Sequence, residues 1–575
     1  MLERLMAFSL RNRLMVGLLV LLIAGVGAWA VGTVPIDAFP DVTNIQVEVV
    51  STAPGLSPLE IERFVTYPIE MSMRGLPGLA QMRSVTKYGI SVVTVVFRDD
   101  VDIFFARQQV HERVAEIERE LPEGVRVEMG PIATAMGEIY QFTLEGKMPA
   151  GEREQVGYLT RLRTVQDWVV TPMLKNVAGV TEVNSFGGYI QQFQVALEPD
   201  RLLKYDLSVD TVFQAIRNNN TNVGGSIVDT HSEEFIIRGV GALRSEADIR
   251  NIVVKAEGGT PIFVSDLGDV RVDHAIRQGA AQANGRECVG GIVMMLRGQN
   301  SWEVVDRVEQ KVKEINESKV LPDGLQIRPF YERSLVIEKS IHTVMQALIE
   351  GSVLVLLVLL LFLGSFRAAM VVILALPLSA LLTFVVMRVT GLNANLMSLG
   401  GLAISIGMII DATIIQVENV QRHLGGNGNV GSKTRTVLQA ALEVRRPSVF
   451  GELIIALTFV PIITLQGMEG KMFSPLAFTV AIALFSSLLL SIFVIPTLCL
   501  AALKGVHHEG RVERATRRTY LPVLRWALGH RLAVVAAAVV LLAVAAALAP
   551  RLGTEFVPIM DEGAFDMDIQ RVPSP

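Results

Sequence analysis

Long apolar runs alternate with mixed sequence along this chain and divide it into membrane and non-membrane parts. Each long run holds on the order of 20 residues, the length that crosses a bilayer as a helix. We expect membrane-spanning helices at 14–32, 341–363, 368–389, 396–418, 448–466, 474–500 and 532–549. Residues 33–340 separate the first two spans, and helix and strand patterns alternate within them. This region is therefore predicted to fold outside the bilayer as an α+β domain.

The α+β region contains a repeat. Thr66-Tyr67-Pro68, followed by Gly78, recurs as Val170-Thr171-Pro172 followed by Gly179, each where a helix ends before an apolar strand. Two units of split βαβ type are predicted. A turn-rich segment interrupts the second unit and leads into a β-hairpin at 226–237, with Asp229 and His231 at its tip. Another copy of the chain would cover such a hairpin, and the alternative is a solvated loop.

These patterns divide the chain into segments. They are the N-terminus with the first span (1–32), a first α+β subdomain (33–135), a second one in two pieces (136–180 and 271–335), a docking subdomain with the hairpin (181–270), spans two to six (336–503), a basic linker (504–531), span seven (532–549) and the beginning of a second outer region (550–575). Arginine and lysine gather in alternate short connections. By the positive-inside rule the N-terminus is cytoplasmic and the large α+β region lies on the outer side.

Composition excludes several classes of function. Charged residues make up 19% of the chain and the net charge is −5, so nucleic acid is not an expected partner. Cys288 and Cys499 lie far apart in the sequence and support neither a disulfide framework nor a cysteine metal site. We find no phosphate-binding glycine loop and no convincing hydrolase pattern. No cofactor is expected, and a proton gradient is the expected energy source.

The fourth span carries the chemistry. Asp411 lies in its middle and Glu418 seven residues later, close to two helical turns, so both carboxylates project from one face. A carboxylate at bilayer depth costs several kcal/mol unless it is protonated, paired or facing water. The alternative for Asp411 is an acid satisfied by contacts between helices. Glu418 lies nearer the cytoplasmic end, where it could instead anchor the helix at the interface.

A second, larger repeat joins the two ends of the sequence. Leu10–Leu14 and the span after it recur loosely as Leu528–Leu532 and span seven. Span seven therefore reads as the first span of a second copy. We expect the sequence to be half of a longer or split transporter, whose missing C-terminal half would complete the coupling site between the repeats.

Several of these residues resemble the resistance-nodulation-division efflux permeases. The matching features are Pro35–Val42 after span one, Asn395–Gly400 entering span four, and Asp411 with Glu418-Asn419. Within that family, Ala53–Glu60 and Gly137–Gln141 resemble the heavy-metal efflux branch. The resemblance covers the whole chain but about half of a family member.

The resemblance implies a proton-driven exporter of heavy-metal cations in the bacterial inner membrane. It implies a homotrimer that works with a periplasmic adaptor and an outer-membrane channel, and a hairpin arm beginning near Gly225 that reaches a neighbouring subunit. Asp411 would carry the proton. Ser405 stands where many metal exporters have a second acid, and its hydroxyl can pass a proton without holding a charge. Silver- and copper-type members also lack that acid, and Met397 would be a thioether ligand for Cu(I) or Ag(I).

Two alternatives remain at this point. The first is a multidrug exporter of the same family that binds apolar amphiphiles in the outer region. The second is a truncated, transport-inactive membrane partner. Methionine is also a common core filler, so the metal role of Met397 has an ordinary packing alternative.

Overall fold

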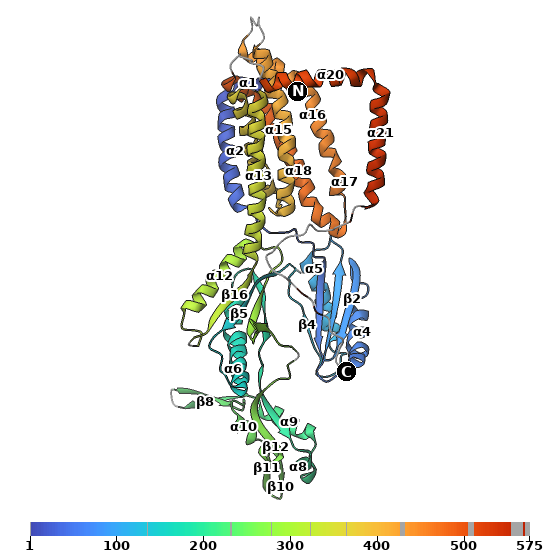
Figure 1. Ribbon diagram of the computed structural model, residues 1–575. Coiled ribbons are helices and arrows are strands. Elements are labelled where there is room, and N and C mark those ends of the chain that lie inside the picture. Colours follow the sequence, from blue (N-terminus) through green and yellow to red (C-terminus); the bar gives the residue numbers. More distant parts are fainter. Residues whose placement is uncertain are drawn as a thin grey trace. The chain divides into compact units, whose positions relative to one another are not determined.

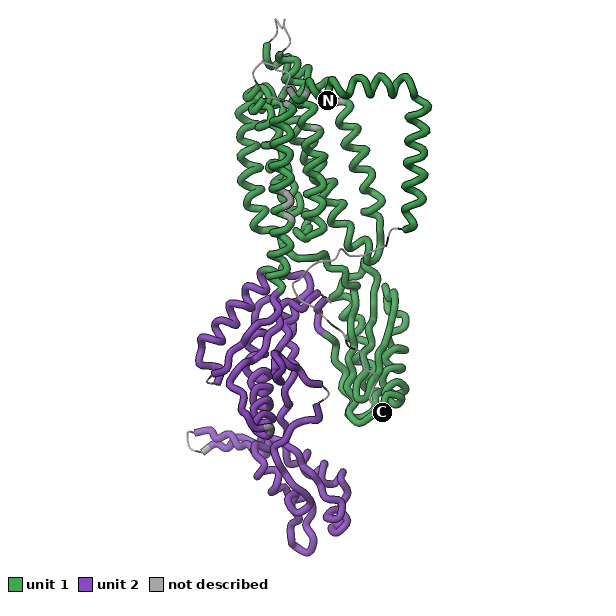
Figure 2. The backbone as a smooth tube through the Cα atoms, in the orientation of Figure 1, with its two compact units in different colours: residues 1–130, 300–302, 333–575 green, residues 131–299, 303–332 purple. Residues whose placement is uncertain are grey.

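The computed structural model describes residues 2–134, 136–230, 233–277, 279–322, 324–363, 365–425, 432–503, 511–551, 553, 567 and 569. It divides into two compact units, which are coloured separately in Figure 2. Unit 1 holds residues 1–130, 300–302 and 333–575, and unit 2 holds residues 131–299 and 303–332.

Unit 1 contains all the long apolar helices (Figure 1). They and their short companions are α1 (Leu2–Arg11), α2 (Arg13–Thr33), α13 (Arg333–Leu363), α14 (Phe366–Thr390), α15 (Leu396–Gly425), α16 (Lys433–Thr458), α17 (Val460–Ile463), α18 (Gly467–Phe493), α19 (Ile495–Ala502), α20 (Arg511–Gly529), α21 (Arg531–Leu548) and the 3-10 turn η3 (Ala549–Arg551). By length and composition, six of the described helices could cross a membrane. The second predicted span lies within α13, whose apolar stretch runs over Ile349–Phe362.

Two spans differ in detail from the sequence prediction. The fifth was expected at 448–466, but α16 begins at Lys433, so Arg445 lies inside a helix rather than in the connection before it. The sixth is divided at Val494 into α18 and α19, where Pro496 occupies one of the first positions of α19. Proline has no N–H for the helix ladder, which accounts for the break.

Helix α15 packs against α14, α16 and α18, and its closest partner is α18. A Cβ placed on Gly401 would lie 2.7 Å from the backbone oxygen of Leu476 on α18, so only glycine permits this approach. Small interfacial residues of this kind allow helix backbones to approach closely in membranes. The core around them includes Leu402, Ile409, Val417 and Ala483.

Unit 1 also carries the first α+β subdomain. Its elements are β1 (Ile45–Thr52), α3 (Pro58–Ile61), the π-helix η1 (Glu62–Thr66), α4 (Tyr67–Met73), β2 (Leu79–Lys87), β3 (Ile90–Phe97), α5 (Ile103–Ile117) and β4 (Arg126–Met129). The strand order is β2-β3-β1-β4, and all neighbouring strands are antiparallel. Val47 of β1 and every second residue of β3 from Val93 onward pack with α4 and α5 in a single core.

Unit 2 repeats this topology. Its sheet is made from β5 (Glu138–Glu145), β6 (Val180–Gly187), β15 (Val289–Met295) and β16 (Gln326–Glu332), in the order β16-β5-β15-β6. The helical elements are α6 (Glu152–Val165), the π-helix η2 (Gln166–Val170), α7 (Thr171–Lys175) and α12 (Ser301–Glu317). Numbered within each unit, both sheets have the same order, and both π-helices end two residues before a proline. The expected fold class, a helical membrane protein with split βαβ subdomains, is confirmed.

An insertion between β6 and β15 interrupts the second sheet. It consists of β7 (Gln191–Leu197), α8 (Pro199–Lys204), α9 (Val209–Asn219), β8 (Val223–Thr230), β9 (Glu233–Gly239), α10 (Glu246–Arg250), β10 (Val253–Glu257), β11 (Thr260–Phe263), α11 (Val264–Leu267), β12 (Gly268–His274), β13 (Gln282–Ala283) and β14 (Arg286–Glu287). Strand β6 continues to Gly187, beyond the boundary expected at 180, because its residues up to Gly187 pair with β15.

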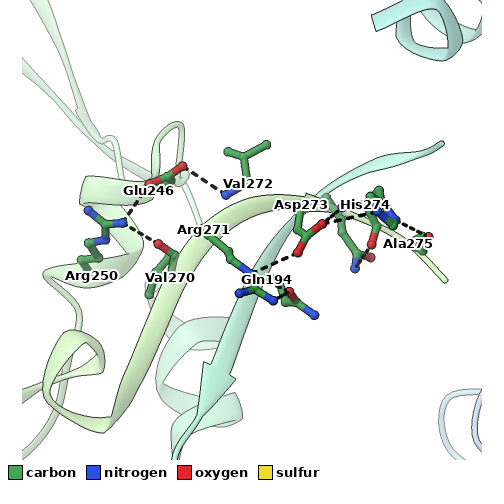
Figure 3. A network of polar contacts seen from close by, with 10 residues as sticks. Gln194, Glu246, Arg250, Val270, Arg271, Val272, Asp273, His274 and Ala275 are labelled. Atoms are coloured by element: carbon green, nitrogen blue, oxygen red, sulfur yellow. Dashed lines mark hydrogen bonds and ion pairs between the residues drawn. The ribbon is translucent and has the colours of Figure 1, made fainter. Parts of the chain in front are cut away.

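Strands β7 and β12 pair along their whole length, and polar contacts tie them to α10 (Figure 3). Arg271 donates through Nε and NH2 to Gln194 Oε1, at 3.0 and 2.9 Å, and its Nε lies 3.0 Å from Asp273 Oδ2. Glu246 accepts from the backbone N–H of Val272 at 3.1 Å. The backbone N–H of His274, with Arg271 as a further cause, lowers the pKa of Asp273. These contacts are exposed, so they fix strand register more than they add stability.

The two ends of the chain share a local structure, as the larger repeat predicted. Asn12 separates α1 from α2, and His530 separates α20 from α21, with φ/ψ of −110°/59° and −118°/47°. Asn12 N–H donates to Phe8 O at 3.0 Å, and His530 N–H donates to Trp526 O at 2.9 Å. In both places a short amphipathic helix turns in the same way into an apolar helix.

Candidate functional site

The predicted proton site lies on one exposed face of α15. Asp411 and Glu418 are both exposed, and so are Ile404 (54%), Ile415 (43%) and Arg422. Successive positions are three, four or seven residues apart, which is one stripe of a helix. Within the described chain, neither Asp411 nor Glu418 makes a hydrogen bond or an ion pair. The structure therefore puts both carboxylates on the same side of α15, as their spacing predicted.

The opposite face of α15 is fixed by packing and by buried polar contacts. Gln416 is fully buried, and its amide donates to Ser491 O of α18 at 3.2 Å. Asn419 donates to Ala440 O of α16 at 2.8 Å. A helix held on one side by its neighbours keeps Asp411 pointing away from them.

Ser405 and Met397 lie apart from this exposed face. Ser405 is fully buried, and its hydroxyl donates to Gly401 O at 2.7 Å, one turn back along its own helix. Met397 is the second residue of α15 and is 8% exposed. Glu418 thus lies on the same exposed face of α15 as Asp411, whereas Ser405 and Met397 do not.

A wide cavity lies in unit 1 near the start of α18. Its volume is 970 Å³, and its lining includes Asp41, Asp99, Asp100, Arg98 and Lys471. Lys471 bonds to Asp99, and Arg98 lies 3.2 Å from Asp100. Cations of the protein therefore balance two of the three carboxylates, so this cavity is not a preformed metal site.

Metal-ligand chemistry is sparse elsewhere too. No group of three or more His, Cys, Asp or Glu side chains that could hold an ion occurs among the residues that the structure describes. Burial, together with Glu145 and Glu287, raises the pKa of Cys288, so its thiol stays protonated at neutral pH.

The predicted docking hairpin is formed by β8 and β9. Gly225 lies at a bulge between Gly224 and Ile227, where a Cβ would come 2.5 Å from the backbone oxygen of Ile237. Asp229 pairs with Glu234 near the end of the ladder. His231, the other predicted tip residue, lies outside the described residues. The described hairpin strands are exposed, which suits an arm that binds another surface.

Two ion pairs in unit 1 were not predicted as part of the site. Arg445 and Glu452 of α16 form a buried bidentate pair at 2.9 and 3.0 Å. Asp37 and Arg333 form another at 2.8 Å. Arg445 and Glu452 are seven residues apart, a helical spacing that could have indicated the first pair. Asp37 and Arg333 lie 296 positions apart, and no sequence pattern links them.

Comparison with known proteins gives a consistent family. The profile of the AcrB/AcrD/AcrF family matches residues 5–575. The chain is 43% identical over 584 residues to the "Cobalt-zinc-cadmium resistance protein CzcA" of Cupriavidus metallidurans, covering 100% of the chain and 54% of that protein. It is 36% identical over 582 residues to the "Cation efflux system protein CusA" of Escherichia coli strain K12, covering 98% and 54%.

A crystal structure of a heavy metal efflux pump is similar to this fold, with a TM-score of 0.84 and 34% sequence identity. The match covers 96% of the chain and 53% of that structure's chain. The chain thus spans about half the length of the relatives it matches. Its paired βαβ subdomains, its apolar helices and its sequence agree: the chain belongs to the AcrB/AcrD/AcrF family.

Proposed function

We propose that this chain is the N-terminal half of a proton-driven permease that exports heavy-metal cations. The observation that carries the proposal is Asp411, a carboxylate in the middle of an apolar helix that makes no contact with a cation within the described chain. Such a group changes its charge by taking up or releasing a proton. Family membership supports efflux, and Asp411 supplies the group through which a proton gradient could drive it.

The mechanism is alternating access. Protonation of Asp411 from the outer side removes its charge and lets the exposed face of α15 repack against an apolar neighbour. Deprotonation toward the cytoplasm restores the charge and reverses the repacking. Because the other face of α15 is tied to α18 through Gly401 and Gln416, the two helices respond together. The α+β subdomains open and close in step, and Glu418 serves as a second acceptor on the same stripe.

We infer that the chain lies in the bacterial inner membrane with its N-terminus in the cytoplasm. Basic residues in alternate short connections support this orientation. The α+β subdomains then lie in the periplasm. We infer a homotrimer in which the β8–β9 hairpin reaches a neighbouring subunit, with a periplasmic adaptor and an outer-membrane channel completing the export path.

The proposal also concerns which cation is exported. Cobalt, zinc and cadmium are the first ions to test, since the relative at 43% identity is named for them. Cu(I) and Ag(I) are the other candidates, because thioethers select soft ions and Met397 lies at the beginning of α15. Met397 is almost fully buried, so a metal role would require α15 to move.

A growth assay tests the function. Metal-sensitive cells that express the complete gene should tolerate more cobalt, zinc, cadmium, copper or silver than cells with the empty vector. Asp411→Asn should abolish the gain while the protein is still produced, because the amide does not exchange its charge. Resistance to apolar drugs without resistance to any metal would refute the proposal in favour of multidrug export. Full metal resistance in Asp411→Asn would refute the role of the proton site.

A further inference from the structure

The carboxylate of Asp37 makes more long-range contacts than its place in a linker suggests. Asp37 lies four residues after α2. Its Oδ1 accepts from Arg333 NH2 at 2.8 Å and Arg333 Nε at 3.1 Å, and its Oδ2 accepts from Ser301 Oγ at 2.9 Å. Three segments far apart in the sequence therefore meet at one side chain.

The backbone around Asp37 adds a fourth segment. Asp37 N–H donates to Ala394 O at 3.1 Å, and Ala394 N–H donates to Pro35 O at 2.9 Å. Leu396 N–H, at the beginning of α15, donates to Ala38 O at 3.1 Å. The linker after α2 is thus clamped to the segment that leads into the helix of Asp411.

Both side-chain partners of Asp37 lie where the chain passes between the two units. Arg333 is the first residue of unit 1 after unit 2, and β16 runs into α13 there without a linker. Ser301 opens α12, which continues into unit 2 from Glu303 onward. If the chain shifts at either of these two junctions, Ser301 or Arg333 moves with it, and each of these residues is bonded to Asp37.

Burial makes this contact costly to break. The Arg333 side chain is 6% exposed and that of Asp37 is 22% exposed. A second ion pair near the membrane helices, Lys471 of α18 with Asp99, is more open, with Asp99 47% exposed. Solvent screens an exposed pair, whereas the loss of a carboxylate beside a buried guanidinium is costly because the guanidinium charge stays out of water.

We propose that Asp37 is a positioning residue that couples the proton site on α15 to unit 2. Hydrogen bonds with Ala394 and Leu396 join the segment of Asp37 to the beginning of α15. Its contacts with Arg333 and Ser301 join it to the segments through which the chain enters and leaves unit 2. A shift of α15 after protonation of Asp411 then reaches α12 and β16 through one partly buried carboxylate. Coupling of this kind needs an element that both sites bias, and the Asp37 cluster is that element. The inference rests on the proposed function.

The test measures coupling separately from folding. In proteoliposomes with the complete transporter, cation export and proton flux are recorded together for wild type, Asp37→Asn and Asp37→Glu. The charge-neutral Asp37→Asn should lower cation export per proton by about tenfold, within the 5–150-fold range of typical coupling energies. Asp37→Glu, which keeps the carboxylate, should retain most of the ratio. Asp99→Asn, the matched control at the exposed pair, should stay within about twofold of wild type, as expected for a screened contact.

Three results would overturn the inference. The first is an unchanged ratio in Asp37→Asn. The second is a parallel loss of both fluxes with a lowered melting temperature, which would show that Asp37 only stabilises the fold. The third is an equal effect of Asp99→Asn. An Asp411→Asn measurement in the same vesicles separates the two proposals. If Asp411→Asn exports cations normally, the proposed proton site is wrong. If Asp411→Asn fails to export but Asp37→Asn keeps the wild-type ratio of export to proton flux, only the coupling role of Asp37 is wrong.

Discussion

Removing Glu452 should destabilise the helix bundle strongly. Its carboxylate accepts two hydrogen bonds from Arg445, at 2.9 and 3.0 Å, and the two side chains are 9% and 1% exposed. Pro447 lies between them in α16, where it removes one backbone hydrogen bond, and the pair braces the helix across that position. In Glu452→Ala the guanidinium stays buried without a counter-charge and keeps only the Ser448 hydroxyl, at 3.1 Å, as a partner. Loss of one member of a buried ion pair costs about 3–5 kcal/mol.

Reversible unfolding in mixed micelles measures this effect, with a double variant that removes both charges as its control. Arg445→Leu combined with Glu452→Leu removes both charges and should be close to neutral, since well-packed apolar residues often replace a buried pair without loss. The single variants should therefore be much less stable than the double variant. If Glu452→Ala lost less than about 0.5 kcal/mol, the typical scale of an exposed pair, the pair would be hydrated and the reasoning refuted.

Two further predictions concern packing and pH. Gly401→Ala should destabilise the bundle by about 1–3 kcal/mol, because its Cβ would press on the backbone of Leu476. Gly407→Ala is the control and should not destabilise it, because nothing lies within contact distance of its Cβ. Thermal unfolding of both variants measures the difference. Burial, with Glu309 as a lesser cause, raises the pKa of Glu332. The folded protein is therefore most stable while Glu332 is protonated. This contribution to stability is complete below the ordinary pKa of 4.5 and is lost as the pH rises through the raised pKa. Glu332→Gln should therefore be more stable than wild type at neutral pH and equal to it in acid, and equal stabilities at neutral pH would contradict this.

The sequence predicted what depends on local periodicity. Apolar runs marked the membrane helices, and alternating residues marked the strands of both βαβ units. The spacing of Asp411 and Glu418 predicted their common face, because two helical turns return to the same side of α15 whatever surrounds the helix. The loose repeat of Leu10–Leu14 at Leu528–Leu532 predicted that span seven resembles span one, and the backbone angles at Asn12 and His530 agree with that likeness.

Contacts between distant segments were beyond such reasoning. Arg445 was expected in the connection before the fifth span, because that span was predicted to begin at 448, whereas α16 begins at Lys433. Asp37 looked like one acid in a linker motif, and its partners Arg333 and Ser301 are 296 and 264 positions away. The direction of Ser405 was also open, since a small hydroxyl can bond to its own helix or face a neighbour. These outcomes depend on tertiary packing, which periodicity does not encode.

Proton flux driven by a metal cation tests the central claim most directly. Proteoliposomes that contain the complete transporter and a pH-sensitive dye are given a zinc gradient, and the change of internal pH is followed for wild type, Asp411→Asn and Glu418→Gln. The account predicts zinc-dependent proton movement in wild type, none in Asp411→Asn, and reduced but measurable movement in Glu418→Gln. Zinc-dependent proton movement in Asp411→Asn at the wild-type rate would contradict it.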